Sequence, residues 1–345
     1  MEKRVTLRDI AKATGLHFTT VGLVLRNNPR VKASTAAKVR RAAHQLGYTQ
    51  DAMLSALSTY RHASARKFAG AIGFIVTYPP EALNRPFFTD RIVVDAATQY
   101  AKSQGFSIEL FQINAPGMTA ARMNQILQAR NIQGLILATR MPEPGAMPEL
   151  DWKHFSTVAI GYSITNLTLH RACPHHARNM RLCLHELHSR GYRRIGLVLQ
   201  RTIHERNMGI VLGAYLSEQY LDAAESRVAP LVTDQVSKAS LHQWLRAERI
   251  DCTIVLTEHP LEIHQWILEL GYRVPDEMGV ALICRWGIND AIAGIDERPE
   301  LFGEAAANFA VSLIQHNERG LPESPRYLLV QGRWVERPTV RPLSA

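Results

Sequence analysis

The first fifth of the chain carries nearly all of its excess positive charge. Residues 1–67 hold 13 Lys and Arg against 3 Asp and Glu, whereas the rest of the chain holds 27 against 28. Because cationic side chains neutralise phosphates and release counterions, a local excess of this kind is typical of a surface that binds nucleic acid. A basic surface that is merely solvated is the alternative, and the helical spacing described below favours nucleic acid.

Histidines form the other concentration of residues that could do chemistry. They are His170, His175, His176, His185 and His188. His185 and His188 stand three apart on a predicted helix, a spacing that metal ligands use. However, no H-E-x-x-H motif is present and no cysteines or carboxylates complete a site, so we expect solvated or capping histidines and no bound metal. A nucleophile elbow, a phosphate-binding loop and paired carboxylates are also absent from the sequence, so we expect no catalytic residues and no cofactor.

Three short helices are predicted to position the basic residues. Thr6 followed by Asp9 resembles a capping arrangement, so the first helix should begin at Leu7. Gly15 can adopt a positive φ and permits a sharp turn into a second helix over residues 18–25. A third helix is predicted over residues 34–46. Their apolar faces should meet through Ile10, Ala11, Leu16, Val21, Val24, Leu25, Val39, Ala42, Ala43 and Leu46. Such a helix pair in basic surroundings is the usual frame for placing one helix in a DNA major groove.

The segment after this unit has a different character. Residues 50–60 can form about two helical turns, which are too few to be stable alone in water. Residues 61–67 are typical of a linker. We therefore expect residues 50–60 to become ordered only when something holds them.

From residue 69 onward, short β-branched or apolar runs alternate with amphipathic stretches, which is typical of parallel sheets covered by helices. The predicted strands are 71–76, 108–112, 134–138, 157–160, 195–199, 253–256 and 280–284. The predicted helices are 89–104, 117–129, 177–190, 205–220, 239–247, 261–270 and 302–318. Gly105, Gly191 and Gly271 fall after helices, where a left-handed cap residue is needed. About 275 residues of this pattern suffice for two similar lobes.

Size and composition restrict the class of protein. The length suggests two or three domains, and 46% hydrophobic residues is ordinary for a soluble globular protein. No apolar run reaches membrane-spanning length, and the N-terminus lacks the apolar segment of a signal peptide. The four cysteines include no C-x-x-C pair and are expected to be free thiols in a reducing compartment. We therefore expect a cytoplasmic protein with no membrane partner.

Taken together, these segments resemble the lacI (lac repressor) family of bacterial transcription regulators. The resemblance is strongest in residues 5–25 and 31–48, with support from 191–196, 270–277 and 332–338. It implies an α/β fold in which a helix-turn-helix headpiece precedes a two-lobed core of parallel sheets like that of type 1 periplasmic binding proteins. The implied parts are a headpiece over 1–49, a hinge helix and linker over 50–67, and a core over 68–345. The first lobe would comprise 68–162 with 292–322, and the second 163–291 with 323–340.

The resemblance assigns base contacts to the start of the second helix. Phe18 and Leu23 could contact thymine methyl groups, and Thr19 could bond a base edge or a phosphate. Packing inside the bundle is the alternative for Phe18 and Leu23. Members of the family often have Ser and Arg where this chain has Gly22 and Leu23, which puts the preferred half-site in question. Plausible phosphate contacts, each of which could instead be merely solvated, are Thr6, Thr20, Asn27 and Arg30.

The segment around Leu54 and Leu57 aligns with the family's hinge helix, in which paired leucines wedge into the minor groove. Leu57 is the residue that we expect to form the wedge. Gln50 and Asp51 replace the Pro-Asn that usually precedes this helix, although Asp51 can still cap it. A linker helix packed on the core is the alternative.

The resemblance places a small-molecule effector in a cleft between the lobes. Arg206 begins a match to the family's R-x-x-G, whose arginine faces that cleft and offers fork donors for hydroxyls or a carboxylate. A surface arginine is the alternative. The Asp residues that many sugar-binding relatives carry near Thr257 and His175 are absent, which disfavours a standard hexose. The aromatic candidates, for which core packing is the alternative, are Tyr78, Phe87, Tyr162 and Trp286.

The sequence thus predicts a DNA-binding transcription regulator, a repressor, that binds a pseudo-palindromic double-stranded DNA operator as a homodimer. A small, sugar-like effector would rotate the lobes and bring the two hinge segments together or apart. Two alternatives use the same two-lobed core. A metal-dependent enzyme lacks supporting motifs, and the missing signal peptide and the basic headpiece argue against a solute-binding protein for transport.

Overall fold

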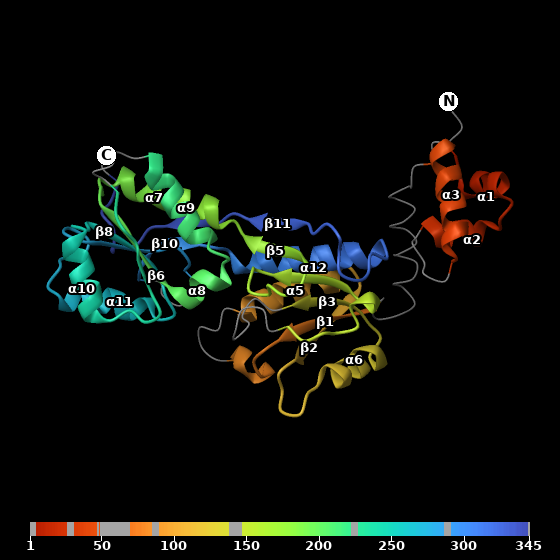
Figure 1. The fold of residues 1–345 in the computed structure, drawn as a ribbon, viewed down its shortest axis with the longest axis horizontal. Helices are drawn as coiled ribbons and strands as arrows, with labels where there is room; N and C mark the ends of the chain where they lie inside the picture. The colour runs from red at the N-terminus through yellow and green to blue at the C-terminus, as the bar shows by residue number, and fades with distance from the viewer. Residues whose placement is uncertain are drawn as a thin grey trace.

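The computed structural model describes residues 5–25, 31–46, 48, 70–84, 90–137, 147–221, 227–285 and 291–343. At the N-terminal end, helices α1 (Leu7–Thr14), α2 (Phe18–Leu25) and α3 (Ala33–Gln45) form a small three-helix unit (Figure 1), hereafter the headpiece. Its buried apolar residues are Ile10, Val21, Val24, Val39 and Ala43. The predicted first residues of α1 and α2 are confirmed.

Local chemistry explains the ends of α1. The backbone N–H and the hydroxyl of Thr6 both donate to Asp9 Oδ2, at 2.8 and 2.7 Å. Gly15 caps the other end with φ of 68°, in the left-handed region that favours glycine. One predicted core residue is wrong: Leu46 is 39% exposed, because α3 ends at Gln45 and Leu46 follows its last turn.

The first lobe of the core contains a six-stranded sheet in the order β11-β5-β4-β3-β1-β2, with all neighbours parallel. The strands are β1 (Gly70–Val76), β2 (Phe106–Gln112), β3 (Ile132–Leu137), β4 (Ser156–Ile160), β5 (His170–Pro174) and β11 (Tyr327–Val330). Helices α5 (Asp90–Ser103) and α12 (Pro299–Gln315) cover one face, and α6 (Ala120–Ala129) covers the other. The short 3-10 helices are η1 (Pro80–Asn84) and η2 (Trp152–His154).

The second lobe repeats this plan with the order β12-β10-β9-β8-β6-β7. Its strands are β6 (Ile195–Gln200), β7 (Leu231–Thr233), β8 (Cys252–Leu256), β9 (Gly279–Leu282), β10 (Ala293–Asp296) and β12 (Arg333–Val335), of which only β12 runs antiparallel to its neighbour among the described pairs. Helices α7 (His176–Ser189) and α9 (Ile210–Leu221) cover one face, while α10 (Lys238–Ala247) and α11 (Pro260–Glu269) cover the other. The short helix α8 (Arg201–Arg206) follows β6.

The chain crosses between the lobes three times, from β5 to α7, from β10 to α12 and from β11 to β12. The strands that each sheet contains differ from those expected from the predicted lobe boundaries. β5 and β11 were expected in the second lobe but belong to the first sheet, and β10 was expected in the first lobe but pairs in the second. For β5 the reason is burial, because Ala172 and Cys173 are fully enclosed in the first lobe.

The seven predicted strands are present, and the described residues contain five more, namely β5, β7, β10, β11 and β12. The predicted helix over residues 205–220 is two helices, α8 and α9, because Met208 and Gly209 have φ of 52° and 72° and interrupt it. Gly105, Gly191 and Gly271 have positive φ, as predicted.

All four cysteines are free thiols, as predicted, and burial raises the pKa of the Cys173 thiol to about 12. None of the helices within the described ranges is both long and apolar enough to cross a bilayer.

Candidate nucleic-acid interface and interlobe edges

The exposed part of α2 is its first turn. Phe18 is 44% exposed, and its ring centroid lies 4.5 Å from that of His17. Thr19 is also exposed, with its Oγ1 2.8 Å from His17 Nδ1. The carbonyl of His17 accepts from the backbone N–H groups of Thr20 and Val21, so the helix starts directly after it. Phe18 and Thr19 therefore lie in the hydrogen-bonded first turn of α2, with exposed side chains.

The other predicted DNA contacts of the headpiece are placed as follows. Leu23 and Thr20 are partly buried, while Thr6 is exposed with its hydroxyl engaged by Asp9. Val21 and Val24 supply the buried face of α2, so Phe18 is not needed in the core. The remaining candidates lie outside the described residues: Asn27, Arg30, Leu54 and Leu57. DNA contact by each candidate stays a prediction.

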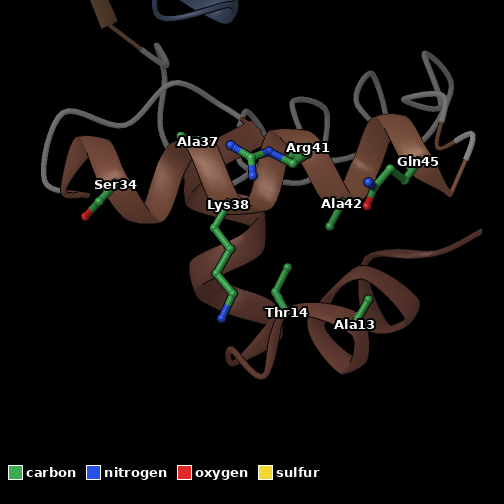
Figure 2. Close-up of a pocket in the computed structure, with 8 residues that line it drawn as sticks. All are labelled: Ala13, Thr14, Ser34, Ala37, Lys38, Arg41, Ala42 and Gln45. Carbon is green, nitrogen blue, oxygen red and sulfur yellow. The ribbon is translucent and has the colours of Figure 1, made fainter.

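A cationic groove between α1 and α3 was not anticipated from the sequence (Figure 2). Its volume is about 400 Å³, and its lining residues are Ala13, Thr14, Ser34, Ala37, Lys38, Arg41, Ala42 and Gln45. We call it the α1–α3 groove. Lys38 and Arg41 extend from α3 along it, the lining contains no carboxylate, and neither cation forms an ion pair within the described residues. Lys38 and Arg41 stand three apart on one helix, and this spacing was the available sequence signal.

The predicted effector residues of the described chain follow the carboxyl ends of parallel strands. Tyr78 comes after β1, Tyr162 after β4 and Thr257 after β8, and Arg206 ends the helix that follows β6. The chain also leaves both sheets at carboxyl ends when it crosses between the lobes, so these ends form the two edges that face the junction. Ligands of open α/β sheets bind at such edges. Phe87 and Trp286 lie outside the described residues.

On the second lobe, polar groups gather at this edge. Arg206 Nη2 lies 3.4 Å from Glu258 Oε1, and the Glu258 N–H donates to Gln200 Oε1 at 2.9 Å. Three buried polar atoms here form no hydrogen bond within the described chain: Arg206 Nε, Thr257 Oγ1 and His204 Nδ1. Buried polar groups are nearly always satisfied, so this set suits a polar ligand or water. Glu258 and His204 were not among the predicted residues.

On the first lobe, Tyr162 is enclosed and not open to the junction. It is 8% exposed, its hydroxyl donates to the Pro174 carbonyl at 3.3 Å, and its ring lies 5.6 Å from that of His176. Burial is the main reason that its pKa is raised above the ordinary value for tyrosine. This is the packing alternative that the sequence left open for Tyr162, and ligand contact by Tyr162 stays a prediction.

The crossing segments themselves are joined by buried polar contacts. His176 Nδ1 lies 3.3 Å from Glu297 Oε1, and both side chains are almost fully buried. The Gly332 N–H donates to Asn179 Oδ1 at 2.9 Å, and the His175 N–H donates to the Val330 carbonyl at 2.8 Å. Among the described residues, no group of three or more His, Cys, Asp or Glu is arranged to hold a metal ion. His188 instead has Nδ1 3.1 Å from the Tyr192 carbonyl, and His185 lies on the exposed side of α7.

Comparison with known proteins agrees with this arrangement. The family model described as "Bacterial regulatory proteins, lacI family" matches residues 6–51, the segment that contains α1, α2 and α3. The chain is similar to the uncharacterized HTH-type transcriptional regulator YkvZ of Bacillus subtilis (strain 168), with 24% identity over 344 residues that cover 97% of this chain and 99% of that one. It is also similar to the maltose regulon regulatory protein MalI of Escherichia coli (strain K12), with 27% identity over 155 residues, or 42% of each chain.

Two solved structures share the fold. One is a transcriptional regulator CelR-cellobiose complex, with a TM-score of 0.56, 17% identity and coverage of 97% of this chain and 100% of that one. The other is the lac repressor dimer bound to operator and the anti-inducer ONPF, with a TM-score of 0.54, 19% identity and coverage of 99% and 100%. These likenesses confirm the predicted fold class, a helix-turn-helix headpiece followed by a two-lobed core of the periplasmic-binding-protein type.

Proposed function

We propose that the chain is a helix-turn-helix transcriptional regulator of the lacI family and not an enzyme, and that it acts as a cytoplasmic repressor. It binds a pseudo-palindromic operator as a homodimer, and a small molecule at the interlobe edges changes its affinity for that operator. The observation that carries the proposal is the exposed first turn of α2, where Phe18 and Thr19 project from a basic headpiece.

We propose a homodimer because a single headpiece presents one short exposed helix, α2, to DNA. Two related headpieces can occupy successive turns of the major groove, which requires a palindromic site. The lac repressor dimer bound to its operator has the same fold. Base contacts are assigned to Phe18, Thr19 and Leu23, and phosphate contacts to Thr6, Thr20, Asn27 and Arg30.

The effector is proposed to be a polar, sugar-like molecule held by Arg206 and Thr257, with the aromatic residues Tyr78, Phe87, Tyr162 and Trp286 around it. The three unsatisfied polar atoms at the second-lobe edge support a ligand with several hydroxyl or carboxylate groups. The cellobiose complex offers a sugar precedent on the same fold. The ligand changes DNA affinity only if it binds the two lobe arrangements unequally.

Binding to DNA fragments tests the operator proposal directly. The purified protein should prefer a palindromic fragment from the region upstream of its own gene over random DNA of equal length, at two salt concentrations. Specific sites are typically about 10³-fold tighter or more than random ones. A protein that binds all fragments equally at both salt concentrations would not be a sequence-specific regulator.

The hinge assignment is tested with Leu57→Ala. If the leucine wedges into the minor groove, the variant should lose specific affinity by about tenfold or more while its affinity for random DNA changes little, because only the specific complex contains the kink. Equal losses on both kinds of DNA would show that Leu57 is not the wedge.

The effector site is tested by thermal unfolding in a panel of sugars, oligosaccharides and nucleosides. A ligand at 100 times its Kd stabilises the protein by about 2.7 kcal/mol. Arg206→Ala should abolish the shift given by the active compound. Arg201→Ala is the matched control, because Arg201 lies on the same short helix but is paired with Asp234 and half exposed. An unchanged shift in Arg206→Ala would remove Arg206 from the site.

A further inference from the structure

The ion pair of Arg206 with Glu258, at the second-lobe edge, is loosely held. One guanidinium nitrogen, Nη2, lies 3.4 Å from Glu258 Oε1, and the two side chains are 26% and 44% exposed. In the Arg181–Glu218 pair of the same lobe, by contrast, both Nε and Nη2 donate to one carboxylate oxygen, at 2.9 and 2.8 Å. Ionic hydrogen bonds are ordinarily about 2.7–2.9 Å long, and exposed ion pairs contribute little to stability. Little free energy is therefore needed to separate Glu258 from Arg206.

Two polar groups at this edge lack a hydrogen-bond partner among the described residues. They are Arg206 Nε and Thr257 Oγ1, and both atoms are buried. A guanidinium N–H can only donate and a threonine hydroxyl is able to donate, so an acceptor suits both. The segment that carries Thr257 is held against the end of β6, because the Glu258 N–H donates to Gln200 Oε1 at 2.9 Å. An acceptor supplied by a ligand would satisfy both groups.

The charge of Arg206 decides which kind of acceptor fits. Because Arg206 Nε is buried while the ion pair is in place, a ligand reaches it only if the guanidinium moves and gives up Glu258. A neutral hydroxyl would then leave the positive charge without a counter-charge, which is unfavourable in a partly buried site. A carboxylate or a phosphate supplies that counter-charge and accepts from two guanidinium N–H groups at once.

We propose that the effector carries an anionic group, a carboxylate or a phosphate, that replaces Glu258 as the partner of Arg206 and also accepts from the Thr257 hydroxyl. Glu258 is then a competitor within the chain, which neutralises Arg206 until the ligand binds. An acidic derivative of a sugar fits this site, whereas the neutral parent sugar does not. This inference deepens the effector site of the proposed function and rests on it.

The first experiment compares neutral sugars with their acidic derivatives. The probes are glucose and galactose, the corresponding uronates and the corresponding hexose phosphates, each added to the full chain during thermal unfolding. At least one acid should raise the Tm at a concentration at which its parent sugar does not. The uronates and the phosphates distinguish the two sources of the anionic group. The affinity for the active acid should also fall as the salt concentration rises, because salt screens the attraction between charges.

The second experiment uses Glu258→Gln to test the exchange itself. This change removes the competing carboxylate with little change in size. The active acid should therefore bind about two- to fivefold more tightly, the range expected from the loss of an exposed ion pair. Glu205→Gln is the matched control, because it removes the same charge from an exposed position of α8. It should change the Kd of the acid by less than about twofold.

Several results would overturn the proposal. They are a parent sugar that raises the Tm as much as its acid, a panel in which no acid raises it, and an unchanged or weaker affinity for the acid in Glu258→Gln. Operator binding is measured without any of these compounds and does not depend on them. A neutral sugar whose effect is lost in Arg206→Ala would keep the effector site and remove only its preference for an anion, so the two failures are distinguishable.

Discussion

In the headpiece, the side chains offered to a ligand come from neighbouring residues, since Phe18 and Thr19 open a single helix. At the interlobe edges, the candidate side chains come from segments between Tyr78 and Thr257, and only the order of the strands brings them to the junction. The headpiece site is therefore set by local rules of helix capping and spacing. The interlobe site depends on long-range pairing, which no short stretch of sequence contains.

The two regions also differ in how their folding is secured. The described part of the headpiece has five buried apolar residues, whereas each lobe has two large apolar clusters on opposite faces of a six-stranded sheet. Small units bury a small fraction of their surface and are marginally stable. We therefore expect the headpiece to fail first when either region is weakened.

The largest expected effect follows from this difference. Ile10→Ala removes the centre of the headpiece core and should cost about 2–5 kcal/mol, enough to unfold a marginal unit. DNA binding should fall by at least tenfold, while the main thermal transition of the core stays within about 1 °C of the wild type. Ile72→Ala, in the first sheet, is the matched change and should instead lower that transition. A common loss of stability in both variants would show that the two regions unfold together.

The next effect concerns the exposed ring of α2. Phe18→Ala should weaken specific binding by about 1–3 kcal/mol and leave binding to random DNA nearly unchanged, because an apolar base contact discriminates sequence. Leu46→Ala removes an exposed apolar side chain from the other end of the headpiece and should change neither. Titration of labelled specific and random duplexes checks both. Equal weakening of both affinities would assign Phe18 to packing.

Changes in the α1–α3 groove should have a smaller effect, which appears in the salt dependence of DNA affinity. If Lys38 and Arg41 contact phosphates, the double change Lys38→Ala and Arg41→Ala should reduce the slope of log K against log salt by about two. Lys102→Ala with Arg246→Ala removes the same charge from exposed sites of the core and should leave the slope unchanged. A similar change in both double variants would indicate long-range attraction only.

The smallest effect is a pH dependence in the core. Burial first, and then the Arg326 guanidinium, lower the pKa of His170 below its ordinary value of 6.5, against a smaller opposing effect of Glu318. His170 Nδ1 also accepts from the Arg326 N–H at 3.0 Å, which requires that nitrogen to be unprotonated. The unfolded chain therefore binds the proton more readily, so this contribution to stability is complete above about pH 6.5 and is lost as the pH falls.

Thermal unfolding at pH 7.5 and pH 5 measures this pH-dependent contribution of His170 to stability. The Tm of the wild type should fall between pH 7.5 and pH 5. In His170→Gln the fall should be smaller, by a few degrees at most. His185→Gln, on the surface of α7, should keep the wild-type drop. A drop that is the same in all three proteins would mean that His170 does not titrate differently on folding.

The sequence predicted the elements that obey local rules. Leu7 and Phe18 begin their helices as expected, Gly15 adopts a positive φ, and strands rich in Val, Ile and Leu such as β1 and β8 were placed within one residue at either end. It missed β5, which begins with His170 and Arg171. Arg171 is buried there only because its guanidinium donates to the carbonyls of Gly161 and Ile164, a solution that periodicity does not reveal.

The same distinction applies to the site. Arg206 and Thr257 could be proposed from their place after predicted strands, but the ion pair of Arg206 with Glu258 and the buried contact of His176 with Glu297 join distant segments. The α1–α3 groove was missed because its lining comes from two helices, Ala13 and Thr14 on α1 and the remaining residues on α3. These features arise from packing, and each becomes visible only when the pairing of elements is known.

The three passages of the chain between the lobes have a consequence for its folding during synthesis. On the ribosome, the headpiece emerges complete once α3 has left the exit tunnel, whereas the first sheet lacks β11 until residue 330 has been added. The second sheet waits for β12, which ends at Val335. Both lobes must therefore mature after translation is nearly finished, and a nascent chain can present a folded DNA-binding unit long before it has a partner surface or an effector site to control it.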